Sequence, residues 1–189
     1  LQIQFDYLEK NPDIDVCGGG MQLFGLYKYN TKPSSKHTDI ILNAIEGCPL
    51  NHPTTMMKTE IRNLFELEDN LYQVYKKGYI CAEDYKLWVD LIMKGCKLEN
   101  IPVILNCYRT YESQSTSVLK EEMIKSTTRI QAEYLEFLIS KILKIDEDFS
   151  NMLNASMKLF SFNKISFNCL KKIVILTAEN IKDNLPDII

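Results

Sequence analysis

The stretch from residue 78 to residue 95, GYICAEDYKLWVDLIMKG, contains the densest group of polar residues in the chain and a regular helical pattern. Trp88 and Leu91 recur at helical spacing, so the pattern predicts a helix over residues 83–94 with one apolar side. Gly95 is typical of the position just beyond the end of a helix. The helix opens with two adjacent carboxylates and therefore presents acids at its N-terminus.

The acidic pair has two explanations. Acids favour a helix N-terminus because the helix dipole is positive there, and this structural explanation is sufficient by itself. The alternative is chemical. Position 84 shares a helical face with Trp88, so Asp84 can point toward a cleft while Glu83 points elsewhere. A carboxylate kept ionised by the dipole can accept a proton from a sugar hydroxyl, and an adjacent aromatic ring offers the sugar a flat apolar face.

Outside this helix, the patterns predict part of an α/β sheet domain. A first helix ends at Asn11-Pro12, and a short strand over residues 14–17 enters Gly18-Gly19-Gly20, where the backbone can turn or be approached closely. The alternation over residues 100–108 predicts another strand. The predicted order up to that point is helix, strand, loop, helix, strand, helix, strand, which is typical of an α/β fold.

The remainder of the chain is predicted to be helical. A long helix is expected over residues 119–145 and two less regular helices over residues 150–185. The sequence therefore predicts two domains, an α/β part over residues 1–118 and a helical appendage over residues 119–189.

Composition restricts the class of protein. A hydrophobic share of 46% and a charged share of 25% are typical of a globular protein. The net charge of −3 argues against a nucleic-acid partner. The six cysteines lack the close spacing of a zinc or redox motif, which indicates reduced thiols and a cytoplasmic location. No apolar run is long enough to span a bilayer.

Two further residues are candidates for the site. His52 stands between Asn51 and Pro53 in a predicted loop, where a lone histidine is usually structural. Arg109 follows Tyr108 at the end of the strand predicted over residues 100–108, a position that commonly faces a ligand crevice in α/β sheets, and could clamp a phosphate or carboxylate. An ordinary surface ion pair explains Arg109 equally well. The dinucleotide fingerprint, the P-loop, the nucleophile elbow and the HExxH motif are all absent.

Several stretches, taken in order, resemble family 2 glycosyltransferases of the GT-A fold. They are QFDYLEKNPDIDVCGGG (4–20), CPLNHPTTMMK (48–58), GYICAEDYKLW (78–88), GCKLENIPVILNCYR (95–109) and the serine-rich SQSTS (113–117). The resemblance covers residues 1–118 and implies a partial GT-A domain, its C-terminal, acceptor-side half. Members of the family often carry a histidine two residues after the arginine, whereas this chain has Tyr111.

The resemblance also implies an activity. Asp84 would be the general base that deprotonates an acceptor hydroxyl during inverting transfer from a nucleotide-diphosphate sugar, with Glu83, Trp88, His52 and Arg109 as substrate-binding residues. A divalent metal, Mn or Mg, is expected in the full-length enzyme on an Asp-x-Asp motif that would precede residue 1. Asp13-Ile14-Asp15 matches a strand beyond that motif and is not predicted to bind the metal. The fragment alone is expected to be inactive.

The partners and the location follow from the same resemblance. We expect a nucleotide-sugar donor and a glycan or lipid-linked acceptor, in the synthesis of a surface polysaccharide or glycan. Residues 149–178 carry four lysines and no acidic residue, interleaved with phenylalanines. They either pack on the domain or on a second copy, as in a homodimer, or rest on anionic lipid at the inner face of the membrane. The alternative function is a non-catalytic carbohydrate-binding or assembly module derived from a transferase.

Overall fold

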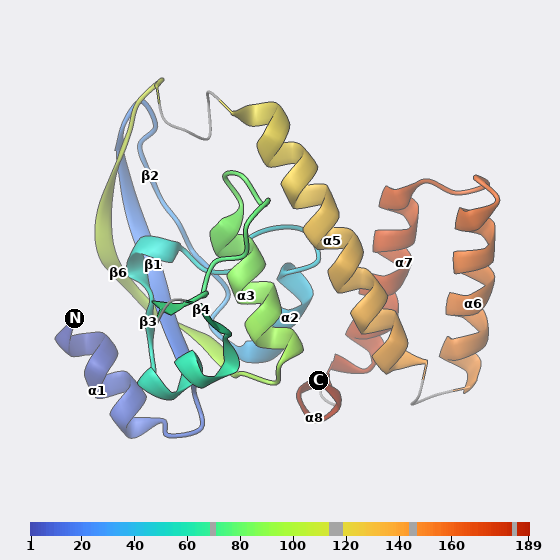
Figure 1. Ribbon diagram of the computed structural model, residues 1–189, viewed down its shortest axis with the longest axis horizontal. Helices are drawn as coiled ribbons and strands as arrows, with labels where there is room; N and C mark the ends of the chain where they lie inside the picture. The colour runs from blue at the N-terminus through green and yellow to red at the C-terminus, as the bar shows by residue number, and fades with distance from the viewer. Residues whose placement is uncertain (69–70, 114–118, 144–146, 183–184) are drawn as a thin grey trace.

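The computed structural model describes residues 1–68, 71–113, 119–143, 147–182 and 185–189, and it has a mixed α/β architecture (Figure 1). Its central sheet is built around one long strand. The strands of this sheet are β1 (Val16–Gly25), β2 (Tyr29–Asn30), β3 (Met56–Met57) and β6 (Leu98–Thr110). β6 lies parallel to β1, whereas β2 and β3 pair antiparallel with β1, at its C-terminal and N-terminal parts respectively. The α/β class expected from the sequence is therefore confirmed.

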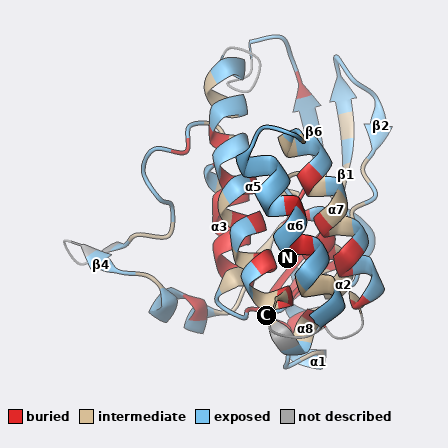
Figure 2. Ribbon diagram, turned by 90° about the vertical axis from the view of Figure 1, so that its right-hand side faces the viewer, coloured by how far each residue is buried: buried red, intermediate tan, exposed pale blue. Residues whose placement is uncertain are grey.

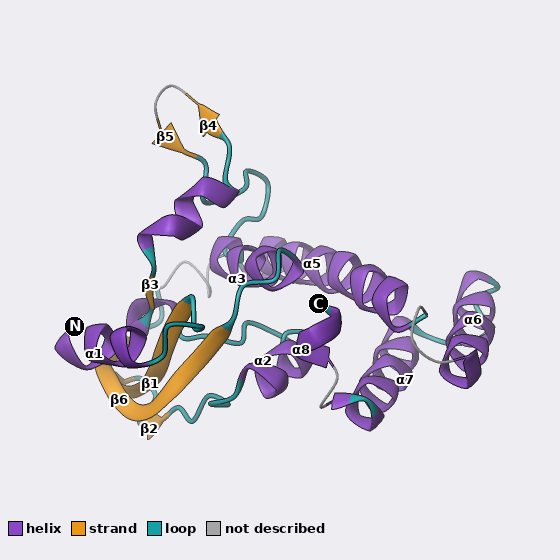
Figure 3. Ribbon diagram, turned by 90° about the horizontal axis from the view of Figure 1, so that it is seen from below, coloured by secondary structure: helices purple, strands orange, loops and turns teal. Residues whose placement is uncertain are grey.

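The helices pack on both faces of this sheet and beyond it. They are α1 (Gln2–Lys10), α2 (His37–Asn43), η1 (His52–Thr54), η2 (Thr59–Leu64), α3 (Glu83–Met93), α5 (Lys120–Ile142), α6 (Glu147–Ser161), α7 (Phe167–Asn180) and α8 (Leu185–Ile188). A two-stranded hairpin of β4 (Leu67–Glu68) and β5 (Leu71–Tyr72) stands away from the main body (Figure 3). The predicted helices at 83–94 and 119–145 are observed as α3 and α5.

The alternation of side chains along β1 separates two hydrophobic clusters. Val16 points to the large cluster that includes α2 and α3, and Cys17 points to a small one with Leu8 of α1 and Ile101 of β6. Successive residues of a strand point to opposite faces, so α1 covers one face of the sheet while α2 and α3 cover the other. Figure 2 shows that buried residues are concentrated along α3 and on the inner side of α5.

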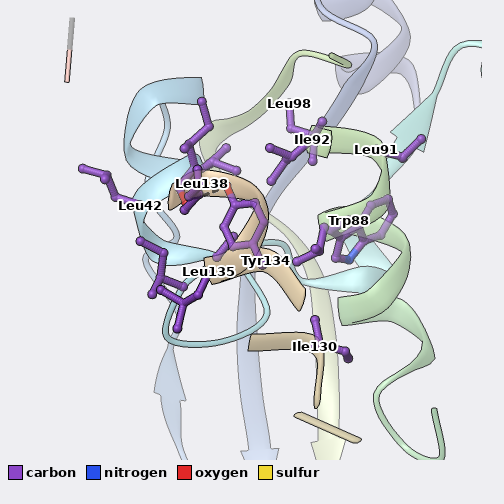
Figure 4. Close-up of a cluster of buried hydrophobic side chains, with 14 of the residues drawn as sticks. Leu42, Trp88, Leu91, Ile92, Leu98, Ile130, Tyr134, Leu135 and Leu138 are labelled. Atoms are coloured by element: carbon purple, nitrogen blue, oxygen red, sulfur yellow. Dashed lines mark hydrogen bonds between the residues drawn. The ribbon is translucent and has the colours of Figure 1, made fainter. Parts of the chain in front are cut away.

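The long helix after residue 118 belongs to the same core as the sheet. Trp88 of α3 and Tyr134 of α5 are both fully buried members of the large cluster, and Figure 4 shows their side chains in one group with Leu91, Ile130 and Leu138. The Tyr134 hydroxyl donates a hydrogen bond to the Ile41 carbonyl of α2 at 3.0 Å. The predicted division into two domains stays a prediction, and its boundary at residue 118 lies outside the described residues. The parts on either side of it share one hydrophobic core.

The three consecutive glycines lie inside β1 and allow a close approach of neighbouring chains. A Cβ atom at Gly19 would lie 2.5 Å from Cδ1 of Leu105, and one at Gly18 would lie 2.6 Å from Oδ1 of Asn100. Of the two expectations for this segment, a turn or a close approach, the structure shows the close approach. The register between β1 and β6 shifts on both sides of Gly20.

Candidate active site

The N-terminus of α3 carries the two candidate acids. Asp84 is half-buried and Glu83 is exposed, while every residue from Tyr85 to Ile92 is buried. The backbone N–H of Tyr85 donates a hydrogen bond to Oδ1 of Asp84 at 2.7 Å. In Figure 1 this end of α3 points to the same upper side of the molecule as the carboxyl ends of β1 and β6. In α/β sheets, ligands bind at the carboxyl ends of parallel strands.

Opposing influences set the charge state of Asp84. Burial raises the pKa of its carboxyl group above the ordinary value. The hydrogen bond from the Tyr85 backbone N–H and the electrostatic interaction with His52 act in the opposite direction, and Glu83 adds to the increase. The net direction is upward, so Asp84 binds a proton more readily than an exposed aspartate. A raised pKa is a property of carboxylates that act as general bases.

His52 is held next to α3 by side chains that attach its loop to the sheet. The Asn51 amide donates to the Gly19 carbonyl at 2.8 Å, and the Thr54 hydroxyl is 3.0 Å from the backbone N–H and 3.1 Å from the carbonyl of the same glycine. β3 and β2 pair with β1 on either side of this position, so these two side chains bond to the backbone between them. The sequence of this segment, NHPTT (51–55), did not predict this role, because side-chain hydrogen bonds to a strand leave no periodic pattern.

An aromatic group surrounds the histidine. The His52 ring lies with its centroid 5.5 Å from that of Trp88 and 6.0 Å from that of Tyr75. The Tyr75 hydroxyl is 3.1 Å from Nε2 of His52. Among the described residues, neither Nδ1 of His52 nor Nε1 of Trp88 has a hydrogen-bond partner, although both atoms are buried. The ring of His52 is thus positioned from two sides.

Trp88 is buried in the core, whereas the sequence analysis expected its ring to be open to a sugar. Its side chain is 0% exposed, so in this structure the indole offers no open face on which a sugar ring could stack. The helical spacing correctly places Trp88 one turn after Asp84, but that face of α3 is turned into the core. The contact with His52 indicates a supporting position behind the site.

Cys48 and Tyr75 join Asp84, and sequence analysis did not identify either of them. Although Cys48 is exposed at the surface, the atoms around its thiol partly desolvate it. This desolvation first, and the charge of Asp84 second, raise the pKa of the thiol, which lies within hydrogen-bonding reach of that carboxylate. Burial and then the charges of Asp84 and Glu83 raise the pKa of Tyr75. Cys48 also borders a pocket of about 270 Å³ whose lining includes the polar side chains of Ser34 and Asn51. The CPLNHP segment is the signal that could have placed Cys48 near His52.

Arg109 lies on the last strand of the sheet. It is exposed, stands at the carboxyl end of β6 and pairs in register with Phe24 of β1. The structure therefore brings together Asp84, His52 and Trp88, with Glu83 beside them. It places Arg109 at the carboxyl end of β6, which lies toward the same side of the molecule as the N-terminal end of α3.

A buried ionic network fixes α3 to α5 one turn beyond the acids. Nζ of Lys86, which is 3% exposed, lies 2.6 Å from Oδ1 of Asp90 and 2.9 Å from Oε2 of Glu133 on α5. The Tyr79 hydroxyl donates to Glu133 at 2.7 Å, and Lys76 pairs with Asp90 at 3.2 Å. Buried charges are stable only when paired in this way. The network therefore ties the 76–79 segment and α5 to the helix that carries Asp84.

The described residues include no group of three or more His, Cys, Asp or Glu side chains that could hold a metal ion. Asp13 and Asp15 both contact Lys97: Oδ2 of Asp13 is 3.6 Å from its Nζ, and Oδ2 of Asp15 accepts from its backbone N–H at 2.8 Å. Within the described residues, the chain thus offers no ligand group for the divalent metal that the family resemblance implies, and the resemblance assigns the ligands of that metal to a motif before residue 1.

Comparison with known proteins agrees on a class of enzyme. A Haemophilus influenzae protein named an uncharacterized glycosyltransferase is 29% identical over 147 residues, which cover 72% of this chain and 43% of the relative. A second uncharacterized glycosyltransferase of the same organism is 30% identical over 108 residues, or 54% of this chain and 36% of the relative. The chain is similar to glycosyltransferases.

A third relative comes from a distant organism. The bifunctional glycosyltransferase pgtA of Dictyostelium discoideum is 26% identical, in a match that covers 95% of this chain and 27% of the relative. The chain thus spans less than half the length of each of these relatives. No family model matches it, and no solved structure matches it. The similarity supports a relationship to glycosyltransferases.

None of the helices in the described part of the chain combines the length and the apolar character needed to cross a bilayer.

Proposed function

We propose that this chain is the acceptor-side part of a family 2 glycosyltransferase of the GT-A fold, which transfers a sugar with inversion from a nucleotide-diphosphate sugar to a glycan or lipid-linked acceptor. The observation that carries the proposal is the half-buried carboxylate of Asp84 at the N-terminus of α3, next to His52. Among the described residues, no lysine or arginine forms an ion pair with Asp84, in contrast to Asp90 on the same helix. Asp84 is therefore available for proton transfer.

Asp84 would act on the acceptor. As the acceptor oxygen attacks the anomeric carbon, its proton passes to the Asp84 carboxylate and the bond between that carbon and the nucleoside diphosphate breaks. A base with a raised pKa accepts this proton more readily than an ordinary aspartate. His52 supplies a nearby ring nitrogen and an electrostatic interaction that opposes the increase in the pKa of Asp84. Trp88 and Tyr75 hold that ring in place.

Donor binding is assigned to a different region. The described residues offer no metal-binding group, and the relatives are more than twice as long as the matched region. We assign the nucleotide-sugar and its Mn or Mg ion to the part of such an enzyme that these alignments leave outside the chain, and no step of the mechanism above uses the ion. Glu83 and Arg109 are proposed as substrate contacts at the edge of the acceptor cleft.

The experiment is the substitution Asp84→Asn in the full-length protein. A general base contributes about 100- to 10,000-fold to the rate, so turnover should fall by a factor in this range. The affinity for a nucleotide-sugar, measured by calorimetry with a panel of common donors, should remain nearly unchanged. Asp148→Asn, an exposed acid at the start of α6, is the matched control and should retain full turnover. Unchanged turnover in Asp84→Asn would remove this residue from its role.

A further inference from the structure

The turn between α6 and α7 forms a compact projection that the active-site proposal does not use. Asn163 has a φ of 55°, the left-handed conformation that ends many helices, and the backbone N–H of Lys164 donates to the Leu159 carbonyl at 2.8 Å. Ser166 then caps α7 by accepting from the Cys169 N–H at 3.2 Å. Because both helix ends have their capping bonds, the turn has a defined shape. We call residues 158–164 the hairpin tip.

The hairpin tip exposes large apolar side chains. Phe162 is 63% exposed and Leu159 is 46% exposed. Phe160 rests against Phe167 across the turn, with ring centroids 6.2 Å apart, and remains partly open to solvent. Three large apolar residues within four positions are costly to leave in water. A surface that covers them would bury this apolar group.

The charge of the same region is one-sided. Residues 149–178 contain four lysines and no acidic residue, although the whole chain has a net charge of −3. Lys158 and Lys164 belong to the hairpin tip and are exposed, and none of the described residues forms an ion pair with either of them. Exposed aromatic residues flanked by lysines are typical of segments that rest at the interface of an anionic bilayer.

The hairpin tip and the candidate site lie toward the same end of the molecule. In Figure 1 the turn between α6 and α7, the N-terminal end of α3 and the carboxyl ends of β1 and β6 all point to the upper side, and α1 lies at the lower side. A surface that covers the hairpin tip would therefore lie on the same side of the molecule as the N-terminal end of α3, which bears Asp84.

We propose that the hairpin tip docks on an anionic lipid bilayer, with Phe162 and Leu159 among the lipid headgroups and Lys158 and Lys164 against their phosphates. The docking itself does not depend on the proposed catalysis. Docking would bring the candidate site to a lipid-linked acceptor in the membrane, and this consequence rests on the proposed function. A second copy of the chain is the less favourable occupant, because a two-fold contact would place the lysines of one tip opposite those of the other.

The experiment is co-sedimentation of the chain with vesicles of phosphatidylcholine, with and without about one-third phosphatidylserine. We expect binding to the anionic vesicles at low salt and its loss near 1 M salt, where the Debye length falls to about 3 Å. Lys158→Gln and Lys164→Gln should each lower the partition coefficient about fivefold, and Phe162→Ser at least as much. The matched controls are Lys10→Gln and Phe5→Ser, exposed residues of α1 at the other end of the molecule.

Three results would overturn the proposal. They are the absence of binding to anionic vesicles at low salt, equal weakening by the α1 controls, and a concentration-dependent dimer, seen by ultracentrifugation without lipid, that Phe162→Ser abolishes. The binding assay contains no sugar donor, so its failure leaves the role of Asp84 unaffected. Conversely, an Asp84→Asn enzyme that turns over normally leaves the vesicle result intact.

Discussion

At the scale of single residues, the site depends on how one carboxylate is placed. Asp84 lies at the first turn of a helix, beside a histidine that comes from a segment 32 positions earlier in the numbering (84 against 52). Burial and the histidine act on its pKa in opposite directions. The proton affinity of the base therefore depends on a contact between two segments that are distant in sequence.

This balance predicts a change in pH dependence on removal of the histidine. His52→Gln removes the electrostatic interaction that lowers the pKa of Asp84, so that pKa should rise. The base must be ionised to act, so the acid limb of kcat/KM should move to higher pH. A pH–rate profile of the full-length enzyme measures the shift. Tyr75→Phe keeps the His52 side chain and should leave the limb in place. A limb at unchanged or lower pH in His52→Gln would contradict the assignment.

A second prediction concerns Glu133 and the fold. Burial alone would raise the pKa of Glu133. The hydrogen bonds from Lys86 and Tyr79 lower this pKa by more than burial raises it, so the net pKa is below the ordinary value. A carboxyl group with a lowered pKa stabilises the fold above its unfolded pKa, and this contribution disappears as the pH falls through the folded pKa. Glu133→Gln should therefore reduce the free energy of unfolding at pH 7 by about 1–2 kcal/mol, since Lys86 retains Asp90.

Urea denaturation at several pH values tests this effect. The difference between Glu133→Gln and the unmodified chain should narrow in acid. Glu136→Gln, an exposed residue of the same helix, should change the free energy of unfolding by less than about 0.5 kcal/mol at every pH. A constant difference for Glu133→Gln across the pH range would show that its charge is not responsible.

The residue types were easier to predict than their surroundings. The spacing of 84 and 88 placed both residues on one face of a helix, as observed. It did not show that this face turns inward at Trp88, because the depth of a helix in the core depends on what packs over it, here α5. Tyr75 had no distinguishing pattern, since contacts between loops follow no period, and Cys48 was indicated only by its place in the CPLNHP segment beside His52.

At the scale of elements, the end of β1 sets a strict requirement on the backbone. Gly25 has a φ of 97°, and a Cβ atom there would lie 2.4 Å from the Thr110 carbonyl oxygen of β6. Both features exclude a side chain, the first by conformation and the second by contact with a backbone atom that is fixed in the sheet. The carboxyl ends of β1 and β6 are thereby held together at the edge where Arg109 lies.

Gly25→Ala should destabilise the chain by about 2 kcal/mol or more, because it adds a clash to an unfavourable φ. Two other glycines distinguish the effect of the clash from the effect of the unfavourable φ. Gly78 has a φ of 89° in open space, so Gly78→Ala should cost about 1 kcal/mol, and Gly47→Ala, with nothing within 4 Å of its Cβ, should be nearly neutral. Thermal and urea unfolding of the three variants checks this order. An equal effect of Gly25→Ala and Gly78→Ala would show that the contact with Thr110 is relieved.

Element types followed well from the sequence, and their pairing did not. The helical patterns predicted α3 and α5 to within a few residues. The glycine run left two readings open, because glycine permits both a turn and a close approach, and only the neighbours Leu105 and Asn100 decide between them. The parallel pairing of β1 and β6 joins residues about 80 positions apart (Val16 and Leu98), which no local pattern records.

At the scale of the whole molecule, the helices beyond residue 118 complete the core of the sheet part. Trp88, Ile41 and Leu98 share one cluster with Ile130, Tyr134 and Leu138 of α5. A chain shortened to residues 1–118 would expose this apolar surface, so it should lose cooperative unfolding and bind hydrophobic dyes. Circular dichroism melts and limited proteolysis test the outcome. A sharp, cooperative transition in the shortened chain would show that the predicted 1–118 domain folds independently.

The general class of the molecule was accessible from the sequence, and its assembly was not. Composition and the order of patterns gave an α/β sheet part followed by helices, and the comparisons agree with a glycosyltransferase. The apolar stripe of α5 was visible in the sequence, but a stripe does not name its partner. Its packing against α3 came from the structure.

The depth of α3 has a consequence for how the walls of the site move. Residues Tyr85 to Ile92 are all buried, so the amide hydrogens of this helix should exchange with solvent only when the whole core opens. His52 and Tyr75 lie instead on a three-residue 3-10 turn and an irregular segment, where local opening requires much less free energy. The part of the site that bears the carboxylate would then remain stationary while the part that bears His52 and Tyr75 fluctuates, so an incoming molecule would meet one fixed surface and one yielding surface.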